Sequence, residues 1–378
     1  MSKSIHSEKA IELLKSLVAV PSFSKEESGR AQLIFDFLTE NHIAAQQHGN
    51  NICAFAHPYD PAKPTLLLNS HIDTVRPVSG WTKDPFEPVV EDGKLFGLGS
   101  NDAGGALTAM IAAFLHFSKE ENVPLNLLLA ATAEEEISGK NGIESILPLY
   151  PFIDAGIVGE PTLLKMAVAE KGLLVLDCIV RGKAGHAARE EGENAIYKAM
   201  KSIEWFRNYR FPEKSEWLGE MKMNITMITA GSQHNIIPDE CRFTVDIRVT
   251  DSYSHEEVLE IIRRHSDCEI VPRSTRLRAS SISENHPLVL AGKKNGLESF
   301  GSPTLSDQAL LPFPTIKFGP GDSARSHTAD EFIFVREIEE GIEKYISLIK
   351  ETEVLITNQG FEFANGLRAS DSQIRNHS

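Results

Sequence analysis

Histidine and carboxylate side chains gather in five short stretches of this sequence, at residues 70–73, 97–105, 132–136, 159–162 and 319–327. Imidazole nitrogens and carboxylate oxygens are ligands that zinc accepts in proteins. Taken singly, each stretch is also typical of something ordinary: a polar strand end, a glycine-rich entry to a helix, a solvated acidic loop or a turn. Taken together, the five stretches indicate a site for divalent cations.

Two of these stretches carry the strongest chemical argument. Glu134, Glu135 and Glu136 follow one another directly after an apolar run. Three adjacent carboxylates at the end of a buried strand repel one another, and a cation is the simplest compensation. His71 stands two residues before Asp73, and a metal-binding imidazole is commonly oriented by such an acid.

Other chemistries do not match the residues. Gly97 and Gly99 begin a dinucleotide-binding pattern, but its third glycine would fall at Asp102, whose carboxylate would repel a pyrophosphate. The helical zinc motif H-E-x-x-H is absent from the sequence. The run 321–325 lacks the closing glycine of a G-x-S-x-G serine hydrolase turn.

The elements that must position these residues follow from the hydrophobic pattern. Apolar runs at 65–69, 125–131 and 155–158 predict buried strands, each ending just before one of the stretches above. Amphipathic or apolar helices are predicted at 8–20 with Ser7 as N-cap, at 26–41 and at 105–117. Alternating strands and helices favour an α/β fold with helices on both faces of the sheet, and such sheets bind ligands at their strand ends.

The pattern changes near Gly172. Strands are predicted at 173–181, 222–230, 241–249 and 268–272, and helices at 194–207 and 255–265. The second helix begins with the capping pair Ser254 and Glu257. The resulting order β-α-β-β-α-β is the split ferredoxin-like unit.

The strand and helix alternation resumes at Pro287 and ends in a helix at about 335–351. We therefore expect a catalytic domain formed by 1–172 and 286–366, an inserted domain at 173–285 and a polar, frayed tail at 367–378.

Composition limits the partners. The 378 residues include 38 Lys and Arg against 53 Asp and Glu, a formal net charge of −15. A surface this acidic disfavours nucleic acids and anionic membranes. No stretch approaches the ~20 apolar residues of a membrane span. Neither nucleic acid nor membrane is therefore expected as a partner. The four scattered cysteines form no C-x-x-C pair, so we expect a cytoplasmic protein with reduced thiols.

In this order, the five stretches resemble the M20 family of dinuclear zinc amidohydrolases over nearly the whole chain. The resemblance is strongest to the acetylornithine deacetylase branch, whose S-H-x-D-x-V signature is matched by residues 70–75. It implies a zinc-aminopeptidase-like catalytic domain with a mixed sheet, and an inserted ferredoxin-like α+β domain that acts as a lid and a dimerisation domain.

The resemblance also implies a metal site. Asp102 would bridge two zinc ions, for which cobalt or manganese could substitute. His71 and Glu160 would complete one metal, and His327 and Glu136 the other.

Further roles are implied by the same resemblance. Glu135 would be the general base that acts as metal-activated water attacks the amide, and Asp73 would orient His71. In the inserted domain, His186 would stabilise the oxyanion, often across a dimer interface, while Asn235 and Arg248 would bind the substrate carboxylate. A cap at a helix start and a surface salt bridge are the ordinary alternatives for His186 and Arg248.

The chain departs from the family pattern at three positions. The glycine-rich loop has Leu98 where the family has arginine and Gly104 where it has lysine, and Glu134 replaces an aspartate. The ligand Asp102 is retained. These changes put in doubt any role of the two missing basic side chains.

The expected activity is hydrolysis of an N-acyl amino acid, most of all N2-acetylornithine to ornithine and acetate in arginine biosynthesis, or a close acyl-ornithine or acyl-lysine analogue. A succinyl-diaminopimelate desuccinylase or an M20 dipeptidase is the alternative within the family, and a non-catalytic metal-binding interaction protein is the alternative outside it. Glu170 and Asp322 are acids that could meet the ornithine amine. A homodimer through the inserted domain is expected, because His186 would need a neighbour's site to act.

Overall fold

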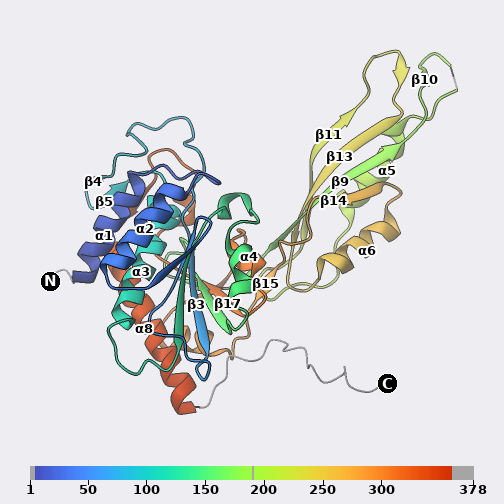
Figure 1. Ribbon diagram of the computed structural model, residues 1–378. Helices are drawn as coiled ribbons and strands as arrows, with labels where there is room; N and C mark the ends of the chain where they lie inside the picture. Colours follow the sequence, from blue (N-terminus) through green and yellow to red (C-terminus); the bar gives the residue numbers. More distant parts are fainter. Residues whose placement is uncertain (1–4, 190, 360–378) are drawn as a thin grey trace, which may run out of the picture. The chain divides into compact units, whose positions relative to one another are not determined.

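The computed structural model describes residues 5–189 and 191–359. Over these residues the chain divides into two compact units, of which the second comprises Ala169–Ser281 and Gly301–Leu305 and the first comprises the rest (Figure 1). The inserted domain was expected at 173–285; the second unit begins at Ala169, its main stretch ends at Ser281, and it also includes Gly301–Leu305, which was expected in the catalytic domain. The predicted polar tail at 367–378 lies outside the described residues.

The first unit is built on a mixed sheet. Its strands, in spatial order, are β1 (Ala45–His48), β2 (Asn51–Phe55), β6 (Asn126–Thr132), β3 (Thr65–His71), β7 (Ala155–Val158), β17 (Thr315–Lys317) and β8 (Met166–Glu170), with β16 (Ser299–Ser302) beside β8. The last two residues of β8 and the short strand β15 (Ser280–Ser281), which pairs with them, belong to the second unit. The four strands β6, β3, β7 and β17 are parallel, whereas β2 and β8 join antiparallel. Every residue of β3 and β6 is buried, as expected for parallel strands covered on both faces.

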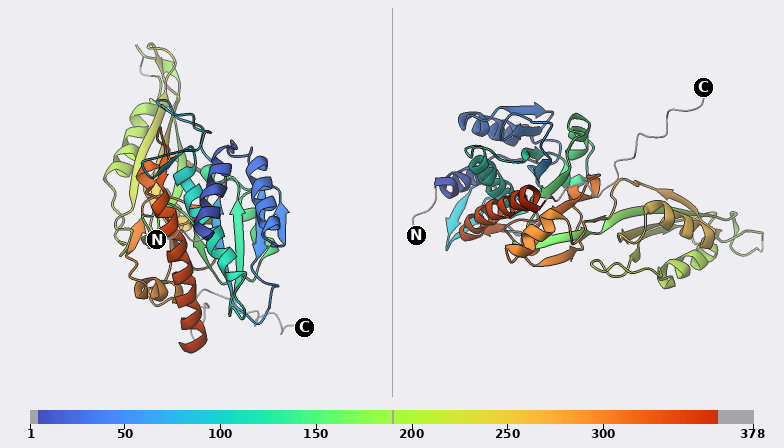
Figure 2. Two further views of the ribbon diagram at one scale, coloured as in Figure 1. Left: turned by 90° about the vertical axis from the view of Figure 1, so that its left-hand side faces the viewer. Right: turned by 90° about the horizontal axis from the view of Figure 1, so that it is seen from below.

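Helices cover both faces of this sheet. They are α1 (Ile5–Val18), α2 (Ser28–Glu40), α3 (Gly105–Phe117), α4 (Ile143–Ile146), α7 (Pro287–Lys294) and α8 (Val335–Gln359). The helices α1, α3 and α8 pack on one another, and α3 packs on β3 and β6 (Figure 2). On the opposite face, Ile143 and Ile146 of α4 pack against Leu67 and Leu128. The predicted α/β fold with a mixed sheet covered on both faces is therefore confirmed.

One local prediction is wrong. Ser7 was expected to cap the first helix, but the chain is already helical from Ile5, so Ser7 lies inside the first turn. It is buried there. A serine just before an amphipathic repeat can be either an N-cap or a buried residue of the first helical turn, and the sequence alone does not distinguish the two.

A small antiparallel sheet, not predicted from the sequence, links two of the candidate loops. It consists of β18 (Phe332–Phe334), β5 (Lys94–Phe96) and β4 (Val89–Glu91), in that order. The pairing of β18 with β5 places the chain after His327 beside the chain before Asp102. The backbone N–H of Gly97 donates to the carbonyl of Glu331 at 3.0 Å.

The second unit has its own sheet and core. The strand order is β11 (Lys222–Ala230), β13 (Glu240–Val249), β9 (Gly172–Arg181) and β14 (Glu269–Pro272), accompanied by α5 (Ala195–Asn208), α6 (His255–His265) and the two-residue strands β10 (Gly185–His186) and β12 (Ile236–Ile237). The chain order is the predicted β-α-β-β-α-β. The capping box of Ser254 and Glu257 is present. Leu174, Phe206 and Val245 lie in a core formed within this unit.

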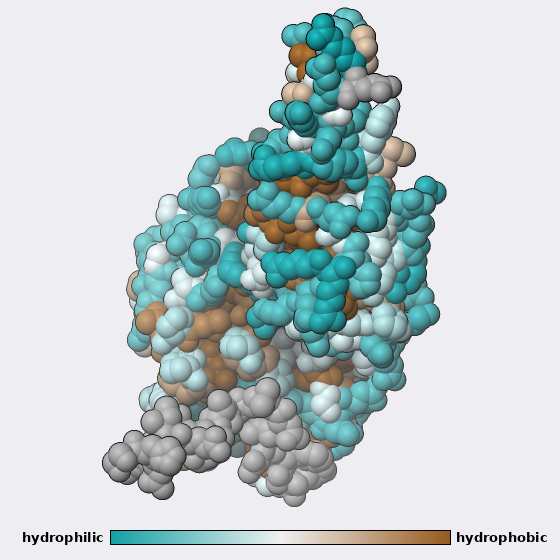
Figure 3. Space-filling view, turned by 90° about the vertical axis from the view of Figure 1, so that its right-hand side faces the viewer, coloured by the Kyte–Doolittle hydropathy of each residue, from teal (hydrophilic) through white to brown (hydrophobic). Residues whose placement is uncertain are grey.

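The described part of the chain contains no helix whose length and apolarity would allow it to cross a membrane. On the face seen in Figure 3, hydrophilic residues cover most of the surface and hydrophobic residues lie in separate patches.

Candidate metal centre

Strand ends place the candidate ligands at one edge of the main sheet. His71 is the last residue of β3, Glu135 and Glu136 follow β6, and Glu160 follows β7. Because these strands are parallel neighbours, their carboxyl ends meet at the same edge. Asp102 reaches this edge from the loop that precedes α3.

The carboxylate of Asp102 faces two histidines with its two oxygens. Its Oδ1 lies 3.2 Å from Nε2 of His71, and its Oδ2 lies 3.7 Å from Nε2 of His327. The Oε1 of Glu160 is 3.8 Å from the first imidazole, and Oε2 of Glu136 is 2.9 Å from the second. The five residues therefore form two histidine and carboxylate pairs that share one carboxylate.

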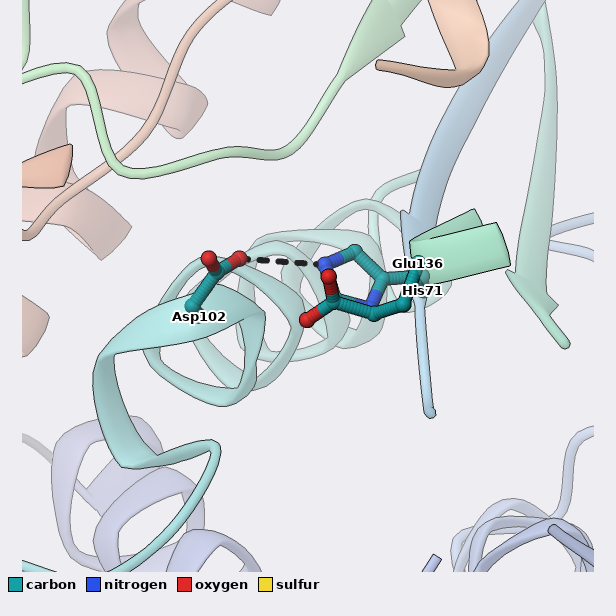
Figure 4. A group of neighbouring side chains, drawn as sticks. All are labelled: His71, Asp102 and Glu136. Carbon is teal, nitrogen blue, oxygen red and sulfur yellow. Dashed lines mark hydrogen bonds and ion pairs between the residues drawn. The ribbon is translucent and has the colours of Figure 1, made fainter. Parts of the chain in front are cut away.

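Two overlapping groups of side chains, both of which include His71, bring their ligand atoms close enough to hold an ion. The atoms of His71, Asp102 and Glu136 lie within 4.8 Å of one another, and so do those of His71, Glu135 and Glu160. Figure 4 shows the first group, with the imidazole of His71 directed at Asp102. Imidazole nitrogen with carboxylate oxygen is a donor set that suits zinc, so the residues present fit the metal that the sequence resemblance implies.

Electrostatics point the same way. Burial raises the pKa of Glu160 to about 8, and the nearby carboxylate of Asp102 contributes although His71 opposes it. Burial alone would lower the pKa of His71, but hydrogen bonds with Asp102 and Asp73 raise it well above its usual value. The hydrogen bond with Glu136 raises the pKa of His327 to about 9. The half-buried carboxylates of this cluster outnumber its two histidines, and a bound cation would reduce the repulsion between them.

Glu135 lies in the same cluster. Burial raises its pKa well above the usual value; His71 opposes this shift, and the carboxylates of Glu160 and Asp307 add to it. A half-buried carboxyl group with raised proton affinity is the kind of group that can act as a general base.

Asp73 makes contacts beyond those expected. The Nδ1 of His71 lies 3.0 Å from the backbone carbonyl of Asp73 and 3.4 Å from its Oδ1. The carboxylate also accepts the backbone N–H groups of Glu135 at 3.1 Å and Glu136 at 3.2 Å, and the hydroxyl of Ser24 at 2.7 Å. One side chain thus contacts both the histidine and the acidic turn.

The remaining acid of the triplet points elsewhere. The carboxylate of Glu134 accepts hydrogen bonds from the backbone and side chain of Asn141. Asp322, considered as a partner for an ornithine amine, accepts the N–H of Ala324 and caps a short helical turn. Glu170, the other acid considered for that role, is buried in β8.

The predicted residues of the second unit lie at two places within it. His186 is on β10, which pairs with β12 directly after Asn235, and the carbonyl of Asn235 accepts the N–H of Ala187 at 3.0 Å. Both residues are exposed. Arg248 lies on β13, where its Nε donates to Asp246 at 2.9 Å. The structure therefore brings His186 and Asn235 together at the two-stranded sheet of β10 and β12 and leaves Arg248 in an ion pair.

Two buried charged residues at the metal loop were not singled out from the sequence. Glu331 and Arg30 are 2% and 3% exposed, and both bind backbone atoms of the loop 98–102. Both come from segments distant in sequence from that loop. The sequence offered only weak signals for them: Arg30 lies inside the predicted helix 26–41, and Glu331 stands just before an apolar run.

These features define a class: an α/β fold that gathers two histidines and several carboxylates, a set of side chains suited to divalent metals, at one edge of its sheet. The chain belongs to peptidase family M20/M25/M40, since a model of that family matches residues 67–351. It is accordingly an enzyme, a metallo-amidohydrolase.

Individual relatives share only low sequence identity with this chain. The protein named succinyl-diaminopimelate desuccinylase 2 from Ruegeria sp. (strain TM1040) is 28% identical over 278 residues, which are 69% of this chain and 70% of that protein. The aminopeptidase PepT of Bacillus cereus has the same fold, with a TM-score of 0.74 at 20% identity over 92% of this chain and 98% of that one. The YXEP protein of Bacillus subtilis, described as a dinuclear metal binding peptidase from the M20 family, gives a TM-score of 0.71 at 16% identity, covering 91% of this chain and 97% of that one.

Proposed function

We propose that this enzyme hydrolyses the amide bond of an N-acyl amino acid, and that N2-acetylornithine is its substrate, giving ornithine and acetate as in arginine biosynthesis. The observation that carries the proposal is the carboxylate of Asp102, whose two oxygens face His71 and His327. A shared carboxylate of this kind suits two cations lying about 3.5–4 Å apart.

Zinc is the proposed metal, with cobalt or manganese as substitutes. His71, Asp102 and Glu160 would hold one ion, and His327, Asp102 and Glu136 the other. When bound, such a pair polarises the amide carbonyl and makes water a nucleophile at neutral pH.

Glu135 is the proposed general base. It takes a proton from the attacking water and then delivers it to the amine nitrogen as the carbon–nitrogen bond breaks. Its raised proton affinity supports this role. Asp73 holds the turn that carries Glu135 through the backbone N–H groups of that turn.

The second unit supplies substrate contacts in this proposal. His186 donates to the oxygen that becomes negatively charged during attack, and Asn235 and Arg248 bind the substrate carboxylate. An arginine can make two parallel hydrogen bonds to a carboxylate, and Arg248 already makes two such bonds to Asp246.

A substrate panel tests the proposal directly. The metal-free enzyme is supplied with zinc and assayed on N2-acetylornithine, N-acetyl-lysine, succinyl-ornithine, succinyl-diaminopimelate and a dipeptide, each with and without a chelator. The highest kcat/KM is expected for N2-acetylornithine, with activity lost in chelator. Inactivity on both acetylated substrates rejects the substrate, and activity that persists without metal rejects the mechanism.

Succinyl-diaminopimelate hydrolysis is the second candidate. It is favoured by the name of the 28% identical relative. The outcome that would select it is a kcat/KM for succinyl-diaminopimelate above that for every acetylated compound in the panel.

We further place this enzyme in the cytoplasm as a homodimer that pairs through the second unit. The thiols of Cys53, Cys178, Cys241 and Cys268 are free, which suits a reducing compartment. The strand β11 lies at a sheet edge and exposes Met227 (61%) and Ile228 (57%). An exposed apolar edge strand is a template for pairing with a second copy.

Sedimentation tests the assembly. Met227→Asp should convert dimer to monomer, because a charge on the paired edge would be buried without a partner. Val271→Asp on the opposite edge, where Val271 is 43% exposed, is the matched control and should remain dimeric. A wild-type monomer with full activity contradicts the dimer.

A further inference from the structure

One buried carboxylate, that of Glu331, accepts three backbone N–H groups of the loop that carries Asp102. The Oε1 of Glu331 accepts the backbone N–H groups of Asn101 and of Asp102 itself, each at 2.9 Å. Its Oε2 accepts the N–H of Gly99 at 3.0 Å. The side chain is 2% exposed, so water does not compete for these bonds.

A buried arginine donates hydrogen bonds to a carbonyl group of the same loop and to a carbonyl group beside His71. The guanidinium of Arg30, on α2, donates to the carbonyl of Leu98 at 3.4 Å and to that of Ile72 at 3.1 Å. Its Nε donates to the carbonyls of Leu17 and Val20. Since Ile72 lies between His71 and Asp73, one guanidinium holds both the backbone beside His71 and the start of the loop that carries Asp102.

The two side chains also balance each other electrically. Burial lowers the pKa of Arg30 to about 10, while Glu331 and Asp73 oppose that shift. A buried carboxylate near Asp102 is costly unless it is both hydrogen-bonded and accompanied by a positive charge. Glu331 has both, so its position beside a second acid has a structural explanation.

The geometry of the loop gives this attachment a functional meaning. Gly99 has φ 75°, and a Cβ there would lie 3.2 Å from Nη1 of Arg30. Asp102 has φ −116° and ψ 101°, outside the helical region, directly before α3. The loop is therefore held in a non-helical form by outside groups, and the direction of the Asp102 carboxylate depends on them.

We propose that Glu331 is a positioning residue for the bridging carboxylate of Asp102, with Arg30 as its counter-charge. The proposal rests on the proposed function, because it assumes that Asp102 binds two ions. Without Glu331 the three N–H groups lose their acceptor, the loop relaxes, and Asp102 no longer presents one oxygen to each histidine. Metal affinity falls, although every ligand side chain is still present.

Zinc binding to metal-free protein provides the test. Wild type and Glu331→Gln are titrated with zinc in a calorimeter, and their unfolding temperatures are measured without metal. Glutamine keeps the size of the side chain, but its NH₂ group faces one of the N–H donors. The wild type should bind two zinc ions, and Glu331→Gln should lose at least tenfold in affinity for one or both.

Asn126→Asp is the matched control. Asn126 also makes three hydrogen bonds from one buried side chain to backbone atoms, to Asp60 and Lys63. It stands at the first residue of β6, the opposite end of that strand from Glu135. This variant should lose stability but bind two zinc ions as tightly as wild type. Equal zinc affinity in Glu331→Gln and wild type would overturn the proposal.

Excess metal provides a second readout. In Glu331→Gln, raising the zinc concentration should restore part of kcat, and the visible absorption spectrum of the cobalt form should differ from that of wild type. A purely structural role would leave both unchanged. If Glu331→Gln does not fold, Arg30→Lys is measured instead. Lysine keeps the positive charge but cannot make the hydrogen bonds of the guanidinium to both Leu98 and Ile72. Unchanged zinc affinity in that variant would overturn the proposal.

The outcomes separate the two proposals. A wild type that binds two zinc ions but hydrolyses no compound of the panel rejects the proposed substrate and leaves the Glu331 comparison valid. A wild type that binds no zinc rejects both.

Discussion

At the residue scale, Glu135 is the side chain whose replacement tests the chemistry most directly. Glu135→Gln keeps the size of the side chain and removes its ability to take a proton. We expect kcat to fall about 10²–10⁴-fold, the usual contribution of a general acid–base group, with little change in KM. Steady-state kinetics on the preferred substrate measures this.

The control is the metal content of the same variant. Zinc bound per chain should equal that of wild type, because the proposed ligands are His71, Asp102, Glu136, Glu160 and His327. A variant with full metal content and undiminished kcat would mean that another group moves the proton.

A second residue-scale prediction concerns Gly104, which stands where the family pattern has lysine. A Cβ at this position would lie 2.4 Å from the backbone carbonyl of Gly99 and 2.7 Å from Leu14. Because the first neighbour is backbone, it cannot move aside cheaply. Gly104→Ala should therefore lower the free energy of unfolding by about 1–3 kcal/mol, as overpacking commonly does.

Urea denaturation of metal-free protein measures the cost, and Gly49→Ala is the control. Gly49 has a left-handed φ of 61° but open space around its Cβ position, so its replacement carries only the backbone penalty of about 1 kcal/mol. A smaller loss for Gly104→Ala than for Gly49→Ala would show that the loop adapts.

The candidate ligands His71, Glu136 and Glu160 could be proposed from the sequence because each lies at or just after the end of an apolar strand in a recognisable short pattern. Arg30 and Glu331 could not, because they act through backbone atoms of a loop about 70 and 230 positions away in the chain. Such contacts leave no local pattern in a single sequence.

At the element scale, several elements with a clear apolar pattern were predicted closely, whereas the three-residue strands were not. The predicted helix 105–117 and strand 155–158 have the bounds of α3 and β7. The three-residue strands of the sheet β18-β5-β4 are too short to show a period. Yet this sheet brings the His327 segment to the Asp102 loop, so the sequence predicted the ligands without the element that unites them.

The last helix, α8, provides an element-scale prediction. Burial raises the pKa of Glu353 to about 7, with a further contribution from Glu120 and opposition from Lys350. Glu353 is thus protonated in the fold at a pH where it is ionised in the unfolded chain. As pH rises from 4.5 to about 7, the unfolded state loses its proton first, and the free energy of unfolding falls.

Glu353→Gln removes this titration. The variant should be more stable than wild type at pH 8 by about 1–2 kcal/mol, since the full shift corresponds to about 3 kcal/mol and partial exposure reduces it. The gain should disappear toward pH 4. Urea midpoints at pH 4, 6 and 8 measure it, and a pH-independent difference would contradict the assigned cause.

At the scale of the whole molecule, the proposed metal ligands and the hydrophobic core of the second unit belong to different units of the chain. All five proposed ligands belong to the first unit, and the second unit has a core of its own. Of the net charge of −15, only a few acids gather at the metal centre, and two divalent ions would offset four of these charges. The acidic excess is thus mainly a property of the surface.

This separation predicts how metal affects unfolding. A ligand that binds only the folded first unit stabilises that unit, by about 2.7 kcal/mol at a concentration one hundred times its dissociation constant. Calorimetry should resolve two transitions, of which zinc raises one by several degrees and a chelator lowers it again. Trp81 lies in the first unit, and Trp205 and Trp217 lie in the second, so fluorescence of single-tryptophan variants assigns each transition. The zinc-dependent transition should be the one reported by Trp81, and Asp102→Asn should abolish its shift. If zinc moves both transitions equally, either the units unfold as one or a second metal site lies outside the first unit.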